Sequence, residues 1–248
     1  MENFEAKLAV LIDADNITDK VFDDLLTEIA KLGDVTVKRI YGDFTSSANA
    51  RWKDVLNKYA IKPISQFAYT TGKNATDSAL IIDAMDLLHT HRIDGFCIVS
   101  SDSDFTGLAT RIKEEGVKVY GFGEKKTPEA FRNACNKFTF IELLKSSEVL
   151  SADSVINNSQ TSRDIQATAP SHIQSENTVP YDLILKAIEN SCDESGFARL
   201  SAVGTSLIRM RPDFDVRLYG RSLASILRER PDLFEITGSL GTIAVRVI

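Results

Sequence analysis

The feature that most constrains the fold is a regular alternation of short apolar segments with helical patterns over the first 145 residues. Apolar segments that run into polar residues occur at 7–13, 35–43, 61–68, 94–100 and 117–123. Between them, apolar residues recur at the helical period over 18–32, 47–58, 76–91, 103–115 and 127–136. Strands that alternate with helices over short connections are typical of a parallel sheet covered by helices on both faces. We therefore expect residues 1–145 to form a three-layer α/β/α domain.

The composition changes after residue 145. Residues 146–179 are rich in Ser, Asn, Gln and Thr, and their scattered apolar residues show no period. This composition predicts a flexible linker. From Pro180, which is suited to a helix start, three short helical patterns precede two alternating segments around the turn "GSLG". The sequence therefore predicts a small winged-helix domain over residues 180–248.

Acidic residues collect where the expected strands end. Asp13 closes the first strand in "LIDADN", Asp43 closes the second, and Asp102 and Asp104 follow the fourth in "VSSDSDF". Asp77 opens the helix that leaves the loop after the third strand. Functional groups of an open parallel sheet gather beyond the carboxyl ends of its strands. We therefore expect these carboxylates to meet at one edge of the sheet.

Such a group of carboxylates suggests a metal site. Carboxylates within about 6 Å of one another either raise one another's pKa values or bind a cation. Oxygen ligands without His or Cys select hard ions, so Mg²⁺ or Mn²⁺ is the expected occupant. One or two such ions activate water for displacement at phosphorus. The structural alternative is that these residues cap helix N-termini. Asp83, further along the helix of Asp77, is expected to support the site or to be structural.

Three motifs together resemble the NYN domain, a relative of the PIN nucleases. They are "LIDADN", "KNATDSALIIDAMDLL" and "VSSDSDFTGLATRIKEEGVKVYGFG", and they look most like the bacterial LabA-like branch of that family. The resemblance extends over residues 6–143. It implies a PIN-like α/β/α fold and metal-dependent cleavage of RNA.

The resemblance also assigns functional residues. It implies that four carboxylates form the catalytic and metal site, with one orienting amide: Asp13, Asp77, Asp102, Asp104 and Asn16. Lys73, in a looser form of the family's Lys-Gly-x-Asp motif, would contact a phosphate of the RNA. Ser101 stands where the family usually has Gly, so the approach of the backbone to a phosphate would be tighter there.

Two other segments near this edge have both a functional and a structural interpretation. Residues 51–53 (Arg-Trp-Lys) are suited to contact RNA, but a helix face is the favoured interpretation. Residues 121–127, "GFGEKKT", are similar to a phosphate loop but lack the spacing of a P-loop, so we expect no ATP site there.

Residues 180–248 resemble the OST-HTH, or LOTUS, domain. The segments "VGTSL", "PDFDVRLYG", "LASIL" and "PDLFEI" occur in the expected order. The resemblance implies binding of single-stranded or G-rich folded RNA, or of a protein partner. Arginine suits phosphates and guanine edges, and Arg217 and Arg221 are the expected contacts. The alternative is that acidic neighbours such as Glu229 neutralise these arginines.

Composition limits the functions and the location of the protein. The net charge of −6 argues against indiscriminate coating of nucleic acid. Three cysteines lie far apart without a Cys/His cluster, as in reduced core thiols of a cytoplasmic protein. No apolar stretch approaches the ~20 residues that span a bilayer, so we expect no membrane association.

Two alternatives to a ribonuclease stay open from the sequence. One is a phosphatase of the haloacid dehalogenase type, in which Asp13 would be the nucleophile and Asp15 the acid. A helical pattern starts almost directly after the first strand, which leaves little room for the cap of such enzymes. The other is a catalytically inactive adaptor that binds RNA and whose acidic site performs no turnover.

Overall fold

The structure is a computed structural model that describes residues 5–44, 52–65, 75–148, 178–238 and 242–248. The chain divides into two compact units. The first contains residues up to Lys145 together with Gly204–Asp215, and the second contains the remainder. The expected linker at 146–179 lies almost entirely outside the described residues, and its limits stay a prediction.

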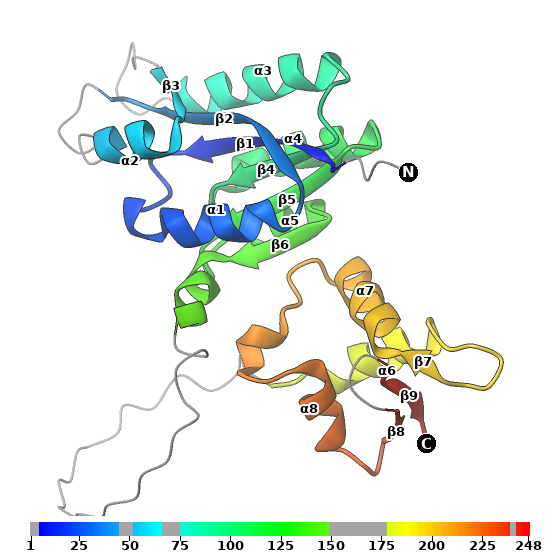
Figure 1. The fold of residues 1–248 in the computed structure, drawn as a ribbon. Helices are drawn as coiled ribbons and strands as arrows, with labels where there is room; N and C mark the ends of the chain where they lie inside the picture. The colour runs from blue at the N-terminus through cyan, green and yellow to red at the C-terminus, as the bar shows by residue number, and fades with distance from the viewer. Residues whose placement is uncertain (1–4, 45–51, 66–74, 149–177, 239–241) are drawn as a thin grey trace, which may run out of the picture. The chain divides into compact units, whose positions relative to one another are not determined.

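The first unit contains a six-stranded sheet in which every neighbouring pair of strands is parallel (Figure 1). The strands are β1 (Lys7–Asp13), β2 (Asp34–Gly42), β3 (Lys62–Ser65), β4 (Gly95–Val99), β5 (Lys118–Gly123) and β6 (Lys137–Phe140). Their order is β3-β2-β1-β4-β5-β6, so the chain winds outward to β3 and then returns to place β4 beside β1. The crevice beyond the carboxyl ends of β1 and β4 is therefore a topological switch point, where ligands bind in open α/β sheets.

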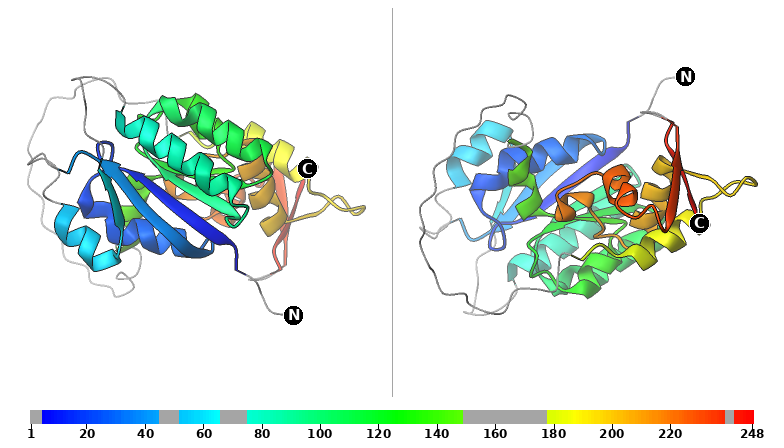
Figure 2. Two further views of the ribbon diagram at one scale, coloured as in Figure 1. Left: turned by 90° about the horizontal axis from the view of Figure 1, so that it is seen from above. Right: turned by 90° about the horizontal axis from the view of Figure 1, so that it is seen from below.

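Helices cover both faces of this sheet (Figure 2). They are η1 (Asp19–Val21), α1 (Phe22–Ala30), α2 (Trp52–Tyr59), α3 (Ala75–His89), η3 (Ser103–Phe105), α4 (Thr106–Glu114), α5 (Glu129–Ala134) and η4 (Ile141–Glu148). One face carries α1 and α2, and the other carries α3 and α4. The ring of Phe105 in η3 packs near the ring of Phe131 in α5, with the two centroids 6.5 Å apart. The expected three-layer α/β/α fold is confirmed.

A buried apolar cluster fixes α1 and α2 against the sheet. Alternate residues of β1 contribute to it, as do the helices and the neighbouring strands: Leu8, Val10, Ile12, Phe22, Leu25, Ile29, Trp52, Cys97 and Val99. Burying such side chains stabilises the fold by about 1.5–3 kcal/mol for each large one. Because alternate residues of a strand point to opposite faces, this cluster also determines which β1 side chains face α3 and α4.

The edge strand β6 is not among the strands expected from the sequence. Its segment "KFTF" has 4 residues and pairs only with β5. An alternation this short is indistinguishable from the end of the preceding helical pattern. Its Phe138 is buried, and it contacts the ring of Phe131 in an edge-on arrangement at 6.0 Å. Residues 47–51 and 66–68 of the expected second helix and third strand lie outside the described residues.

The second unit is built on a three-stranded antiparallel sheet with the order β7-β9-β8. The elements of residues 178–248 are α6 (Tyr181–Glu189), β7 (Ala198–Arg199), α7 (Leu200–Met210), η5 (Val216–Tyr219), α8 (Leu223–Arg228), β8 (Phe234–Thr237) and β9 (Ala244–Val247). The division between the two units falls within α7, whose residues from Gly204 onward belong to the first unit. The hairpin of β8 and β9 pairs Phe234 with Val247. The expected three short helices and terminal hairpin are therefore present, whereas the short strand β7 was not expected.

None of the helices in the described ranges combines the length and the apolar character that crossing a bilayer requires.

Candidate metal centre

The end of β1 and the loop after β4 meet through Asp13 and Ser100. Val10 and Ile12 of β1 face α1, so Asp13 points to the face that α3 covers. Ser100 follows Val99, which also faces α1, and it therefore points to the same side as Asp13. The Ser100 hydroxyl donates a buried hydrogen bond to Asp13 Oδ2 at 2.8 Å. Strand pairing between β1 and β4 thus places the two side chains together.

Two further donors hold the Asp13 carboxylate. Asn16 Nδ2 donates to Asp13 Oδ2 at 2.6 Å, and the Asp15 backbone N–H donates to Oδ1 at 3.1 Å. Asp13 is only 1% exposed. Burial raises the pKa of Asp13 above its ordinary value, while the hydrogen bonds from Asn16 and Ser100 act in the opposite direction. The carboxylate is therefore held in one orientation by partners that favour its ionised form.

The loop after β4 is organised by the same serine. Ser100 Oγ accepts a hydrogen bond from the Asp102 backbone N–H at 3.1 Å. Asp102 Oδ1 in turn accepts from the Asp104 backbone N–H at 2.9 Å and caps η3. Asp102 is therefore a helix N-cap, as the structural alternative expected. The capping role does not exclude a ligand role, because a carboxylate has two oxygens with several lone pairs.

Three carboxylates converge at the switch point. Asp77 lies in the first turn of α3, and one oxygen from each of Asp77, Asp102 and Asp104 lies within 4.8 Å of the others. Asp77 and Asp102 are half-buried, whereas Asp104 is exposed. Ligand oxygens around an octahedral Mg²⁺ lie about 3–4 Å apart, so a small closing of the side chains would suit one ion.

The charges of this cluster are coupled. Burial, followed by repulsion from Asp13, Asp102 and Asp104, raises the pKa of Asp77 to about 6. Asp13 is therefore close enough to act on Asp77 electrostatically, although it lies outside the group of three converging oxygens. A cation at this position would remove the repulsion that raises the pKa. The ligand roles of the four aspartates stay a prediction, and Lys73 lies outside the described residues.

Asp83 occupies a different position on α3. It accepts hydrogen bonds from the side chains of Arg39 and Tyr41, which lie two residues apart on one face of β2. Burial and the Asp83 carboxylate raise the pKa of the Tyr41 hydroxyl. Asp83 therefore anchors α3 to the sheet. The sequence signal was the Arg-x-Tyr spacing in β2, which puts two donors on the face that α3 covers.

Trp52 is a core residue. It is fully buried at the start of α2 and contacts the Phe22 ring edge-on, with centroids 5.8 Å apart. A buried indole offers no face on which a base can stack, so the helix-face interpretation is correct for Trp52. Arg51 lies outside the described residues.

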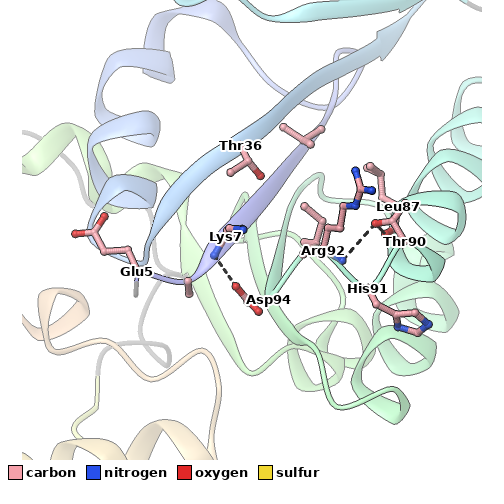
Figure 3. A pocket seen from close by; sticks show the side chains of 11 residues that line it. Glu5, Lys7, Thr36, Leu87, Thr90, His91, Arg92 and Asp94 are labelled. Carbon is pink, nitrogen blue, oxygen red and sulfur yellow. Dashed lines mark hydrogen bonds between the residues drawn. The ribbon is translucent and has the colours of Figure 1, made fainter. Parts of the chain in front are cut away.

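A cavity of about 900 Å³ lies at the opposite edge of the sheet, at the amino ends of the strands (Figure 3). Its lining includes Lys7, His91, Arg92 and Asp94. The Lys7 backbone N–H donates to Asp94 Oδ2 at 2.8 Å. Charges of both signs line this cavity, and none of the carboxylates at the switch point borders it. This cavity is therefore separate from the candidate metal centre.

The segment between β1 and α1 does not favour the phosphatase alternative. β1 ends at Asp13 and η1 begins at Asp19, so the intervening turn is too short to form a cap over the site. Asp15 is exposed.

Several arginines of the second unit pair with carboxylates. Arg221 forms an ion pair with Glu229, and Arg230 pairs with Asp232 at 2.7 Å. The Arg230 guanidinium also lies over the Tyr181 ring, 5.1 Å from its centroid. Arg217 lies half-buried in η5. The neutralising interpretation therefore holds for Arg221, whose contact with RNA would require exchange of Glu229 for a phosphate.

A parallel sheet ordered β3-β2-β1-β4-β5-β6, with carboxylates at the carboxyl ends of β1 and β4, defines a PIN-like α/β protein. The chain belongs to the NYN domain family, which matches residues 7–143, and an OST-HTH/LOTUS domain follows at residues 173–242. NYN domains are part of the PIN-like nuclease superfamily. The second match begins inside the stretch expected to be a linker.

Two solved structures are similar to parts of the chain. One is VPA0982, a protein of unknown function from Vibrio parahaemolyticus, with a TM-score of 0.48 and 17% identity over 56% of this chain and 94% of that chain. The other is an uncharacterized protein from gene locus NE0665 of Nitrosomonas europaea, with a TM-score of 0.26 and 32% identity over 38% of this chain and 92% of that chain. No curated protein sequence matches the chain.

Proposed function

We propose that the protein is a metal-dependent ribonuclease that hydrolyses RNA phosphodiester bonds at the acidic centre. The observation that carries this proposal is the convergence of Asp77, Asp102 and Asp104 within 4.8 Å at the switch point. Their oxygens form a donor set without His or Cys, which suits Mg²⁺ or Mn²⁺. When bound, such an ion would supply an activated water and would offset the charge that develops on the phosphate.

The residues around the cluster have distinct roles in this proposal. Asp77, Asp102 and Asp104 hold the ion, and Asp13 completes the site from its buried side. Asn16 and Ser100 keep the Asp13 carboxylate in one orientation through bonds of 2.6 and 2.8 Å. Outer hydrogen bonds of this kind fix ligand geometry and raise metal affinity. The site is therefore organised before RNA binds.

The second unit supports the proposal through its family. OST-HTH/LOTUS and NYN domains together suggest an RNA-associated protein. In the proposal the second unit binds the RNA, with Arg217 and Arg221 as contacts, and the covalent connection raises the concentration of RNA near the acidic centre. Lys73 would add a phosphate contact to the first unit.

Cleavage of single-stranded RNA by the purified full chain tests the proposal. We expect cleavage with Mn²⁺ or Mg²⁺, none with EDTA, and none in Asp13→Asn or Asp102→Asn. Asp86→Asn is the matched control, because it removes the same charge from an exposed position on α3. Activity that persists in Asp102→Asn would refute the proposed site. Binding without cleavage across a broad panel of RNAs would favour the adaptor instead.

A further inference from the structure

We propose that Lys125, in the turn between β5 and α5, binds a backbone phosphate of the RNA beside the bond that is cleaved. The proposal rests on the proposed function and adds a substrate contact to it. It concerns the "GEKKT" segment, whose sequence suggested a phosphate contact without the spacing of a nucleotide-binding loop.

The turn is attached to the loop that carries Asp102. The Glu124 backbone N–H donates to Ser101 Oγ at 2.9 Å, so the residue next to Asp102 holds the start of the turn. The end of β5 also approaches this loop closely. A Cβ on Gly123 would lie 2.6 Å from the Ser100 carbonyl oxygen, which is closer than atoms can pack. A glycine at 123 therefore permits the close approach of the Lys125 turn to the acidic centre.

The turn itself is closed by its own hydrogen bonds. The backbone N–H and the hydroxyl of Thr127 both donate to the Glu124 carbonyl oxygen, at 2.9 and 2.6 Å. The Lys125 backbone N–H donates to Glu142 Oε1 at 2.9 Å. The backbone of Lys125 is therefore held from two sides while its side chain is exposed. A held backbone lowers the entropy lost when the side chain binds a phosphate.

The two lysines of the turn differ in their surroundings. Lys126 Nζ forms an ion pair with Glu124 at 2.6 Å, and this contact raises the pKa of Lys126. Within the described ranges, the ammonium group of Lys125 forms no ion pair. Lys125 is thus the lysine of this turn whose charge is available to a phosphate.

The negative charge of the acidic centre creates a need for a cation beside the bound RNA. An RNA strand that enters a group of carboxylates needs cations along its backbone, because phosphate contacts position nucleic acid and supply most of its non-specific affinity. Among the turns that join β1, β2, β4 and β5 to the helices after them, as far as the structure describes these turns, only the one after β5 contains lysines, namely Lys125 and Lys126. The turn that carries Lys125 is bonded to the loop of Asp102 through Glu124 and Ser101.

Three charge-removing variants of the full chain test the inference: Lys125→Gln, Lys126→Gln and Lys118→Gln. Lys126 is the adjacent control, and Lys118 is an exposed lysine at the opposite end of the same strand. We expect Lys125→Gln to raise the KM for a short single-stranded RNA about fivefold with little change in kcat, because a phosphate contact binds ground and transition states alike. Lys125→Arg should restore the original KM.

A binding measurement separates this inference from the proposed function. Fluorescence anisotropy with the same RNA, on an Asp102→Asn background and over a range of KCl, does not require turnover. We expect Lys125→Gln to weaken binding about fivefold and to reduce the salt slope by about 0.7, the value for one phosphate of a single strand. Equal behaviour of all three glutamine variants would overturn the inference even if the chain cleaves RNA. A selective loss of binding in Lys125→Gln would support it even if no cleavage is found.

Discussion

The Ser100 hydroxyl donates a hydrogen bond to the Asp13 carboxylate at 2.8 Å, and 87 residues of sequence separate the two side chains. The same hydroxyl accepts from the Asp102 backbone N–H at 3.1 Å. One small side chain thus joins the ends of β1 and β4, orients the Asp13 carboxylate and holds the backbone of Asp102. The contact exists because the chain winds out to β3 and returns to place β4 beside β1.

Replacing Ser100 by alanine should destabilise the first unit. The change removes a donor from a carboxylate that is only 1% exposed and an acceptor from the Asp102 N–H. Asp13 keeps the donors Asn16 and Asp15, and the loss of one hydrogen bond to a charged group costs about 1.5–3 kcal/mol. Urea denaturation followed by circular dichroism measures the loss. Ser103→Ala, at an exposed position of the same loop, should change stability by under about 0.5 kcal/mol. Equal effects of the two variants would contradict the role of Ser100.

Asp104→Asn should weaken the binding of Mn²⁺. Its carboxylate is one of the three that converge within 4.8 Å, so its loss removes both a ligand and a charge. We expect at least a tenfold rise in the dissociation constant, since changes to groups that merely support a metal site already cost about 10–100-fold. Calorimetric titration of the full chain measures this constant. Asp86→Asn should bind Mn²⁺ as the unaltered protein does, and a titration of the unaltered protein without heat would disprove the site.

Asp77→Asn should stabilise the metal-free protein at pH 7.5 more than at pH 5. The pKa of Asp77 is raised from 3.8 to about 6, so the folded state holds this proton over a pH range in which the unfolded chain has released it. The protein therefore loses stability as pH rises through this range, and asparagine avoids the loss. Because Asp77 is only half-buried, we expect a gain of roughly 1 kcal/mol. Thermal unfolding at both pH values measures it.

Metal should reverse the effect of that substitution. A bound cation stabilises the folded protein more when it binds more tightly, and the unaltered chain retains the Asp77 ligand. We expect Mn²⁺ at pH 7.5 to raise the unfolding temperature of the unaltered chain more than that of Asp77→Asn. A larger metal effect on the variant would contradict the ligand role of Asp77.

Asp83→Asn should lower the free energy of unfolding and leave the affinity for Mn²⁺ unchanged. Asp83 accepts from Arg39 and Tyr41, and its loss leaves the Arg39 guanidinium without its carboxylate. The Arg39 and Asp83 side chains are 23% and 20% exposed, so solvent reduces the cost to about 1–2 kcal/mol. Chemical denaturation measures the stability and calorimetry the Mn²⁺ affinity. A loss of Mn²⁺ affinity as large as that of Asp104→Asn would show that Asp83 belongs to the metal site.

Glu229→Gln should strengthen RNA binding if Arg221 contacts phosphate. The Glu229 carboxylate now pairs with the Arg221 guanidinium, and a phosphate has to replace it. Removing an exposed partner of this kind is worth up to about 1 kcal/mol, or roughly fivefold in affinity. Fluorescence anisotropy with single-stranded RNA measures the change. Glu235→Gln, which frees Arg246 in the hairpin of β8 and β9, is the matched control. The same gain in both variants would indicate a general charge effect and would contradict a contact by Arg221.

The periodicity of the sequence was sufficient to predict the strands and helices that form the main layers of the first unit. Five of its strands and the helices between them follow from residues that are close in sequence, because alternation and the helical repeat report which face of an element is apolar. The position of Asp13, Asp77, Asp102 and Asp104 at strand ends and at a helix start follows in the same way. The sequence did not predict β6, because its 4 residues are too few to establish a period.

Partners of individual side chains were decided only by the tertiary structure. The sequence places Asp77 and Asp83 on one helix. The alignment of β2 with α3 determines that Asp83 accepts hydrogen bonds from Arg39 and Tyr41, whereas Asp77 lies in the acidic cluster. Likewise, the order of the strands selects Ser100 as the donor to Asp13 and sets Asp13 beside the three converging oxygens. Local periodicity encodes the face on which a residue lies, whereas strand order and register determine which residue it meets there.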